Sequence, residues 1–136
     1  MRPVIADTGF LVCLFLRDDL HREAAKRYLA GHKHPLVTVA PVIVETCFFL
    51  RPLIKVELLT WIRRGAMSVA EVPADAYPAI ELTLRKYAER DIDFADAALI
   101  WLANESGVRH ILTTDRSDFS TFGLKGGKRF ELLEWL

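Results

Sequence analysis

Four acidic residues stand at positions in the sequence where their carboxylates could share one site. Asp7 and Asp115 each follow a short apolar run typical of a buried strand, and Glu45 and Asp96 each lie in the early turns of a predicted helix. Neighbouring carboxylates raise one another's pKa, and a bound cation relieves that repulsion. Oxygen ligands without a required cysteine or histidine favour Mg²⁺ or Mn²⁺ over Zn²⁺. We therefore expect metal-assisted hydrolysis of phosphodiester bonds.

The elements that must position these acids alternate between strand and helix. Strands are predicted at residues 3–6, 36–39, 68–72, 110–114 and 130–133, and helices at residues 21–30, 41–49, 52–64, 77–88 and 94–106. This order predicts an α/β fold, a three-layer αβα sandwich around a central, mostly parallel sheet of about five strands. With 136 residues, the chain is expected to form a single domain over residues 1–136. The carboxyl ends of parallel strands share one edge, where such folds bind ligands.

Each acid also has a structural interpretation. Asp7 begins Asp7-Thr8-Gly9, which suits a turn, and Glu45 could form a salt bridge, although burying its charge in an apolar helix without a partner or cation is costly. Asp93 is better placed than Asp96 to cap the helix that starts near residue 94. We therefore interpret Asp96 as the metal ligand and Asp93 as the N-cap, which is also expected to support the ligands from beside the site.

Polar residues next to the acids are expected to support them. Thr8 adjoins the first acid, and Thr113, near the end of a strand, is expected to orient Asp115 or the attacking water. Asp118 is expected in a loop, either as an outer acid of the site or as a solvated side chain. His21, at the start of a helix, is interpreted as a surface or packing residue rather than a ligand.

The charge balance excludes a general attraction to polyanions. Eighteen Lys and Arg residues match eighteen Asp and Glu residues, so a polyanion would have to meet a local basic patch. The candidate RNA contacts are the cations on either side of the acids, namely Arg116, Lys125, Lys128 and Arg129.

Cysteine use and hydropathy favour a cytoplasmic protein that does not enter a membrane. Cys13 and Cys47 have apolar neighbours and are expected to pack as free core thiols. The longest apolar run, residues 9–16, is far shorter than the ~20 residues needed to span a bilayer.

Four segments together resemble the PIN domain family, in particular the VapC-like ribonuclease toxins of prokaryotic toxin–antitoxin pairs. They are VIADTGFLV at 4–12, PVIVE at 41–45, FADAALI at 94–100 and LTTDRSDF at 112–119. The resemblance implies that Asp7, Glu45, Asp96 and Asp115 bind Mg²⁺ or Mn²⁺ for endonucleolytic RNA cleavage. It also implies a five-stranded parallel sheet, a homodimer and a partner antitoxin that blocks the site.

The sequence departs from this pattern at Gly9, where many relatives place Ser or Asn, which removes a polar group beside Asp7. Other functions are also considered. A PIN-fold module without catalytic activity would keep the fold and bind no metal. An aspartic protease, which also uses Asp-Thr-Gly, would be all-β and dimeric. A phosphoacceptor receiver domain gathers acids at the same edge, but no well-placed lysine follows a late strand.

Overall fold

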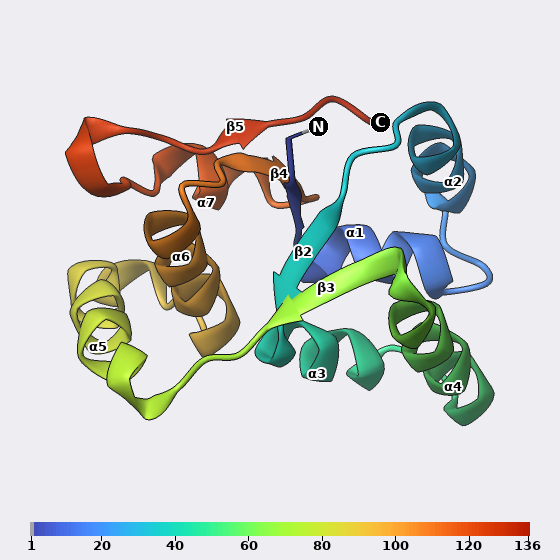
Figure 1. Ribbon diagram of the computed structural model, residues 1–136, viewed down its shortest axis with the longest axis horizontal. Coiled ribbons are helices and arrows are strands. Elements are labelled where there is room, and N and C mark those ends of the chain that lie inside the picture. Colours follow the sequence, from blue (N-terminus) through green and yellow to red (C-terminus); the bar gives the residue numbers. More distant parts are fainter. Residues whose placement is uncertain (1) are drawn as a thin grey trace.

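In the computed structural model, which describes residues 2–136, five parallel strands form the central sheet (Figure 1). Their order is β3-β2-β1-β4-β5, and all four strand pairings are parallel. The strands are β1 (Val4–Ala6), β2 (Leu36–Val39), β3 (Met67–Ala70), β4 (His110–Leu112) and β5 (Glu131–Leu132). The α/β fold with a parallel five-stranded sheet is confirmed, and it rules out the all-β architecture of an aspartic protease.

The direction of chain progression reverses at the centre of the sheet. From β1 the chain moves outward through β2 to β3, and it then returns to form β4 and β5 on the other side of β1. The boundary between β1 and β4 is therefore the point where strand order reverses. In open α/β sheets a crevice forms outside the carboxyl ends of the strands at this point, and ligands bind there.

Seven α-helices accompany the strands within residues 2–136, and Figure 1 shows α1 and α2 on one side of the sheet and α5 and α6 on the other. Their bounds are α1 (Thr8–Phe15), α2 (Arg22–Gly31), α3 (Ala40–Phe48), α4 (Pro52–Trp61), α5 (Tyr77–Lys86), α6 (Phe94–Ser106) and α7 (Arg116–Thr121). The predicted helices are all present, with boundaries shifted by a few residues.

Helices α1 and α7 were not predicted from the sequence. Helix α1 is apolar almost throughout, so it lacks the one-sided periodicity that marks a half-exposed helix. Helix α7 has only six residues, too few for a periodic signal. The expectation that Asp118 lies in a loop is therefore wrong, because this residue is in the first turn of α7.

Helix α6 is the long inner helix that carries one of the acids. Asp93 caps its N-terminus, since the Asp93 side chain accepts a hydrogen bond from the Asp96 backbone N–H at 3.1 Å. Gly107 ends the helix with a φ of 78°, a left-handed conformation that suits glycine. The structure thus confirms Asp93 as the N-cap of the helix that carries Asp96.

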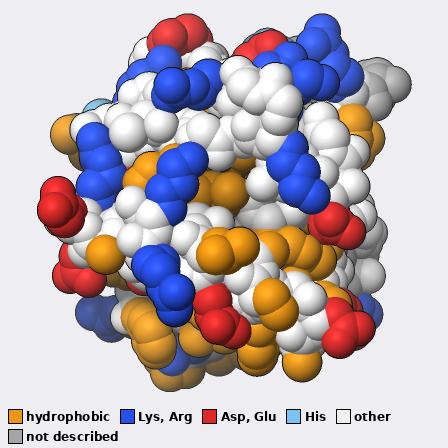
Figure 2. Space-filling model, turned by 90° about the vertical axis from the view of Figure 1, so that its left-hand side faces the viewer, with side chains coloured by type: hydrophobic (Ala, Val, Ile, Leu, Met, Phe, Trp, Pro, Cys, Tyr) orange, Lys and Arg blue, Asp and Glu red, His pale blue; other side chains and the backbone are white. Residues whose placement is uncertain are grey.

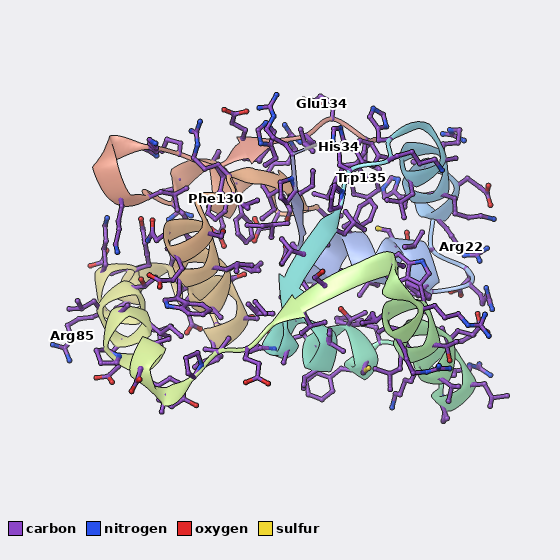
Figure 3. The ribbon with its side chains drawn as sticks, in the orientation of Figure 1. Arg22, His34, Arg85, Phe130, Glu134 and Trp135 are labelled. Atoms are coloured by element: carbon purple, nitrogen blue, oxygen red, sulfur yellow. The ribbon has the colours of Figure 1, made fainter. Side chains whose placement is uncertain are left out.

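The C-terminal segment after β5 packs back onto the protein (Figure 3). The Trp135 ring lies edge-on to Phe10 at 4.9 Å, and its indole N–H donates to the Thr113 carbonyl oxygen at 3.2 Å. Phe130, directly before β5, lies edge-on to Phe119 of α7, at 5.3 Å. These contacts hold the chain just after β4, where one of the candidate acids follows.

Both cysteines are free, with Cys13 buried and Cys47 half-buried. Within residues 2–136, none of the helices combines the length and the apolar character needed to cross a membrane.

Candidate active site

The carboxylate of Asp7 is held at the end of the central strand β1. Its backbone N–H donates to the Leu112 carbonyl oxygen at 3.0 Å, and its side chain is only 6% exposed. The Thr113 hydroxyl donates to Asp7 Oδ2 at 2.7 Å and accepts a hydrogen bond from the Asp115 N–H at 2.9 Å. A single hydroxyl therefore contacts both acids that follow strands, whereas the sequence had suggested that Thr113 orients Asp115 or the attacking water.

Glu45 is brought to this edge by α3, which begins directly after β2. The Thr8 hydroxyl, in the first turn of α1, donates to Glu45 Oε1 at 2.9 Å. Because Thr8 directly follows Asp7 in the chain, this bond links the end of β1 to the acid on α3. It also fixes one carboxylate oxygen of Glu45.

The N-terminus of α6 brings Asp96 to the same group. The charges of Asp93, Asp7 and Glu45 all act on Asp96, and Asp93 also lies close enough to Glu45 to raise its pKa. Asp93, which the sequence identified as a cap, is therefore also part of the acidic cluster. The sequence predicted both the cap and a supporting role for Asp93 beside the metal ligands, and did not specify its proximity to Glu45.

Burial and mutual repulsion raise the pKa values of these carboxyls. Desolvation is the main cause for all three: the pKa of Asp7 rises to about 6, that of Glu45 to about 7 and that of Asp96 to about 8. The hydrogen bond from Thr113 partly counters the effect on Asp7, whereas Asp93 increases the pKa of both Glu45 and Asp96. The cluster is thus poorly suited to carry its full negative charge alone.

Asp115 lies beside Asp7 and has a second structural role. Its side chain accepts a hydrogen bond from the Asp118 N–H at 3.0 Å and so caps α7. Burial raises its pKa, and its charge raises the pKa of Asp7. Asp115 therefore acts on Asp7 while its side chain anchors the helix that follows.

Asp118 is neither solvated nor free. Its carboxylate forms an ion pair with Arg90 at 2.5 Å, and the Arg90 guanidinium also donates to the Thr121 hydroxyl at 3.3 Å. The sequence gave no indication of Arg90, because this contact joins residues 28 positions apart. The ion pair ties α7 to the turn before α6.

Within the described part of the chain, no Lys or Arg forms a salt bridge with Asp7, Glu45, Asp96 or Asp115. The salt-bridge interpretation of Glu45 is therefore wrong. Carboxylates without cationic partners are the donor set that hard divalent cations such as Mg²⁺ and Mn²⁺ prefer. No three His, Cys, Asp or Glu side chains in residues 2–136 converge closely enough to hold a metal ion as they stand. The donors nevertheless fit such an ion chemically.

Two of the four proposed RNA contacts are engaged within the protein. Arg116 pairs with Glu134 at 3.1 Å, and the Arg129 guanidinium donates to backbone carbonyl oxygens near the end of α7. Lys125 and Lys128 instead line a cavity that none of the four acids borders. His21 is exposed at the start of α2, in agreement with its interpretation as a surface residue.

Comparisons of the sequence and of the fold identify similar proteins. The sequence model of the PIN domain family matches residues 4–123. Ribonuclease VapC26 of Mycobacterium tuberculosis is 28% identical over 134 residues, which cover 96% of this chain and 99% of that protein. The crystal structure of VapC20, a sarcin–ricin loop cleaving toxin of the same organism, matches with a TM-score of 0.75 at 24% identity over 84% of this chain and 91% of that one. The structural match shows a shared fold.

Proposed function

Because the chain belongs to the PIN domain family, we propose that it is a divalent-metal-dependent endoribonuclease, the toxin of a type II toxin–antitoxin pair. The observation that supports this most directly is the gathering of Asp7, Glu45 and Asp96, with raised pKa values and no cationic partner, at the reversal point of the sheet. The similarity to Ribonuclease VapC26 over nearly the whole chain supports RNA as the substrate.

We propose Asp7, Glu45, Asp96 and Asp115 as the residues that hold Mg²⁺ or Mn²⁺. When bound, such an ion would withdraw charge from the phosphate and lower the pKa of an attacking water. Thr113 orients Asp7, and Thr8 orients Glu45, so that these carboxylates present defined oxygens. The raised pKa values mean that ion binding must displace protons from the cluster near neutral pH.

The test is cleavage of RNA by the purified protein with Mg²⁺ or Mn²⁺, compared with EDTA and with the Asp96→Asn variant. We expect both to reduce the rate by roughly 100-fold or more, because a ligand contributes at least as much as the outer residues that orient it. Asp75→Asn, which removes an exposed acid outside the cluster, is the matched control and should cleave normally. Undiminished cleavage in EDTA or by Asp96→Asn would refute the mechanism.

Calorimetry with Mn²⁺ distinguishes this proposal from the alternative of a PIN-fold interaction module without catalytic activity. A nuclease should bind Mn²⁺, and Asp96→Asn should weaken that binding. A folded protein that binds no Mn²⁺ and cleaves no RNA would favour the interaction module.

We further propose a homodimer and a partner antitoxin. Large apolar side chains are exposed around the turn between α3 and α4, a surface that proteins usually cover with another chain. This α3–α4 patch consists of Val44, Phe48, Phe49, Leu53 and Val56. We assign it to a second copy of the chain, and the antitoxin is proposed on the similarity to VapC toxins.

A further inference from the structure

A cavity separate from the acidic cluster lies between α5, α6 and the loop over residues 123–129. Its volume is about 450 Å³, within the ~300–1,000 Å³ typical of small-molecule sites. The cavity lining on α6 includes Ile100 and Asn104, four and eight positions beyond Asp96, so at ~1.5 Å per residue the cavity lies about 6 to 12 Å along the helix from that acid. Its polar and charged lining includes Lys86, Asn104, Lys125, Lys128 and Arg129, and no acidic residue borders it.

Three of its cations are free to meet an anion. Within residues 2–136, Lys86, Lys125 and Lys128 form no salt bridge, whereas the Arg129 guanidinium is held by the carbonyl oxygens of Ser120 and Thr121. Figure 2, which looks onto this side of the molecule, shows Lys and Arg side chains around an apolar hollow. A pocket with several ammonium groups and no carboxylate favours phosphate.

The cavity wall is built before any ligand arrives. The loop closes through a hydrogen bond from the Leu124 N–H to the Lys128 carbonyl oxygen at 2.9 Å. The Asn104 side chain on α6 accepts from the Lys125 N–H at 2.8 Å, and the Tyr87 hydroxyl accepts from the Gly123 N–H at 2.9 Å. Because these bonds already fix the loop against both helices, binding there orders little additional chain.

The rest of the lining suits a nucleobase beside the phosphate. Tyr87, Ile100 and Leu124 provide apolar surface beside the lysines; the Tyr87 ring packs against Phe122 at 5.0 Å, and Lys86 Nζ lies 5.3 Å from its centre. Sites for single-stranded nucleic acid commonly combine a basic groove with a ring on which a base stacks. Since the chain as a whole has no net charge, local cations must supply the attraction to RNA.

We infer that this cavity binds one nucleotide of the RNA substrate, with its phosphate held by Lys86, Lys125 and Lys128, on the strand outside the bond that is cleaved. The inference rests on the proposed ribonuclease function, and it adds the path that the RNA takes beyond the site of cleavage. It assigns a role to Lys86, which motif reasoning missed because this residue comes from α5, distant in sequence from the loop.

The test measures binding of a single-stranded RNA oligonucleotide in EDTA, so that no cleavage occurs. The Lys125→Gln, Lys128→Gln double variant should bind roughly tenfold more weakly at 150 mM salt. The slope of log affinity against log salt should flatten by up to about 0.7, the value for one lost phosphate contact on single-stranded RNA, because the two lysines share one phosphate. The matched control removes two charges elsewhere, in the Lys33→Gln, Lys55→Gln double variant, and should change affinity by less than about twofold.

A second pair of variants uses neighbouring residues of α5. Lys86→Gln should weaken RNA binding and raise KM with little change in kcat, because the cavity does not contact the reacting bond. Arg85→Gln should leave binding nearly unchanged, since Arg85 points away from the molecule (Figure 3). Thermal melting of each variant shows whether it remains folded.

The outcomes separate this inference from the proposed function. A wild-type protein that neither binds nor cleaves RNA would refute the function itself. Wild-type cleavage with equal RNA binding by the Lys125, Lys128 and control double variants would show that the cavity inference is wrong. Competition by inorganic phosphate or a free mononucleotide, with RNA affinity unaffected by the lysine variants, would assign the cavity to a small anion and would also overturn it.

Discussion

The hydroxyl of Thr114 occupies the space that a side chain on residue 9 would need. A Cβ atom added to Gly9 would lie 2.0 Å from Thr114 Oγ1 and 3.1 Å from Thr114 Cβ. The absence of a polar side chain at position 9, which was expected to leave Asp7 with less support, therefore coincides with a hydroxyl in nearly the same place. The two positions are coupled by packing.

This coupling makes Gly9→Ser destabilising in the present chain. Because Thr114 must rotate or move, we expect a loss of about 1–3 kcal/mol in the free energy of unfolding, measured by urea denaturation. Combining it with Thr114→Ala should recover most of that loss. If the two changes were additive, Thr114 would not be the obstacle.

Stability of the metal-free protein should fall as the pH rises from about 5 to 8. The folded pKa values of Asp7, Glu45 and Asp96, about 6, 7 and 8, exceed the values of unfolded carboxyls. The folded state therefore binds more protons than the unfolded state across this window, and deprotonation costs stability. The contribution of Asp7 alone is on the order of 3 kcal/mol, at about 1.4 kcal/mol for each pH unit.

Chemical denaturation in EDTA at several pH values measures this slope. Asp96→Asn should show a shallower decline, and saturating Mn²⁺ should stabilise the wild type most at pH 8. Stability that increased with pH over this range in EDTA would contradict the burial of uncompensated carboxyls.

Thr113 is expected to act as a positioning residue. Thr113→Val keeps the shape of the side chain but removes the bonds to Asp7 and to the Asp115 N–H, so the pKa of Asp7 should rise further. We expect Mn²⁺ affinity to fall about 10-fold to 100-fold, with a loss of about 1–3 kcal/mol in stability. Thr113→Ser, which keeps the hydroxyl, should retain most of the affinity in calorimetry. Equal affinities for the two variants would exclude this role.

The α3–α4 patch should determine the oligomeric state. Phe48 and Leu53 are 79% and 77% exposed, and replacing both with Glu should convert a dimer into a folded monomer in light scattering. The control is Leu82→Glu on α5, a site 67% exposed, which should leave the mass unchanged. A double variant that stays dimeric would exclude this interface. Loss of antitoxin binding by that dimer would instead assign the patch to the antitoxin.

Sequence patterns predicted the sheet and most elements that carry the acids, because buried strands and amphipathic helices have characteristic runs and spacings of apolar residues. They also indicated that Asp93 caps α6, because a cap and the backbone N–H that it accepts from are only three residues apart. They did not reveal α1, which is buried almost all round, or the ion pair between Arg90 and Asp118, whose partners are distant in sequence. The cavity cation Lys86 was missed for the same reason as Arg90.

The bond between Thr113 and Asp7 joins residues 106 positions apart. During synthesis, β1 emerges long before β4, so a growing chain carries Asp7 without the hydroxyl that orients it. The acidic cluster can form only after almost the entire sheet has been translated and has folded. The hydrolytic centre that we propose therefore stays incomplete until nearly the whole chain has been made.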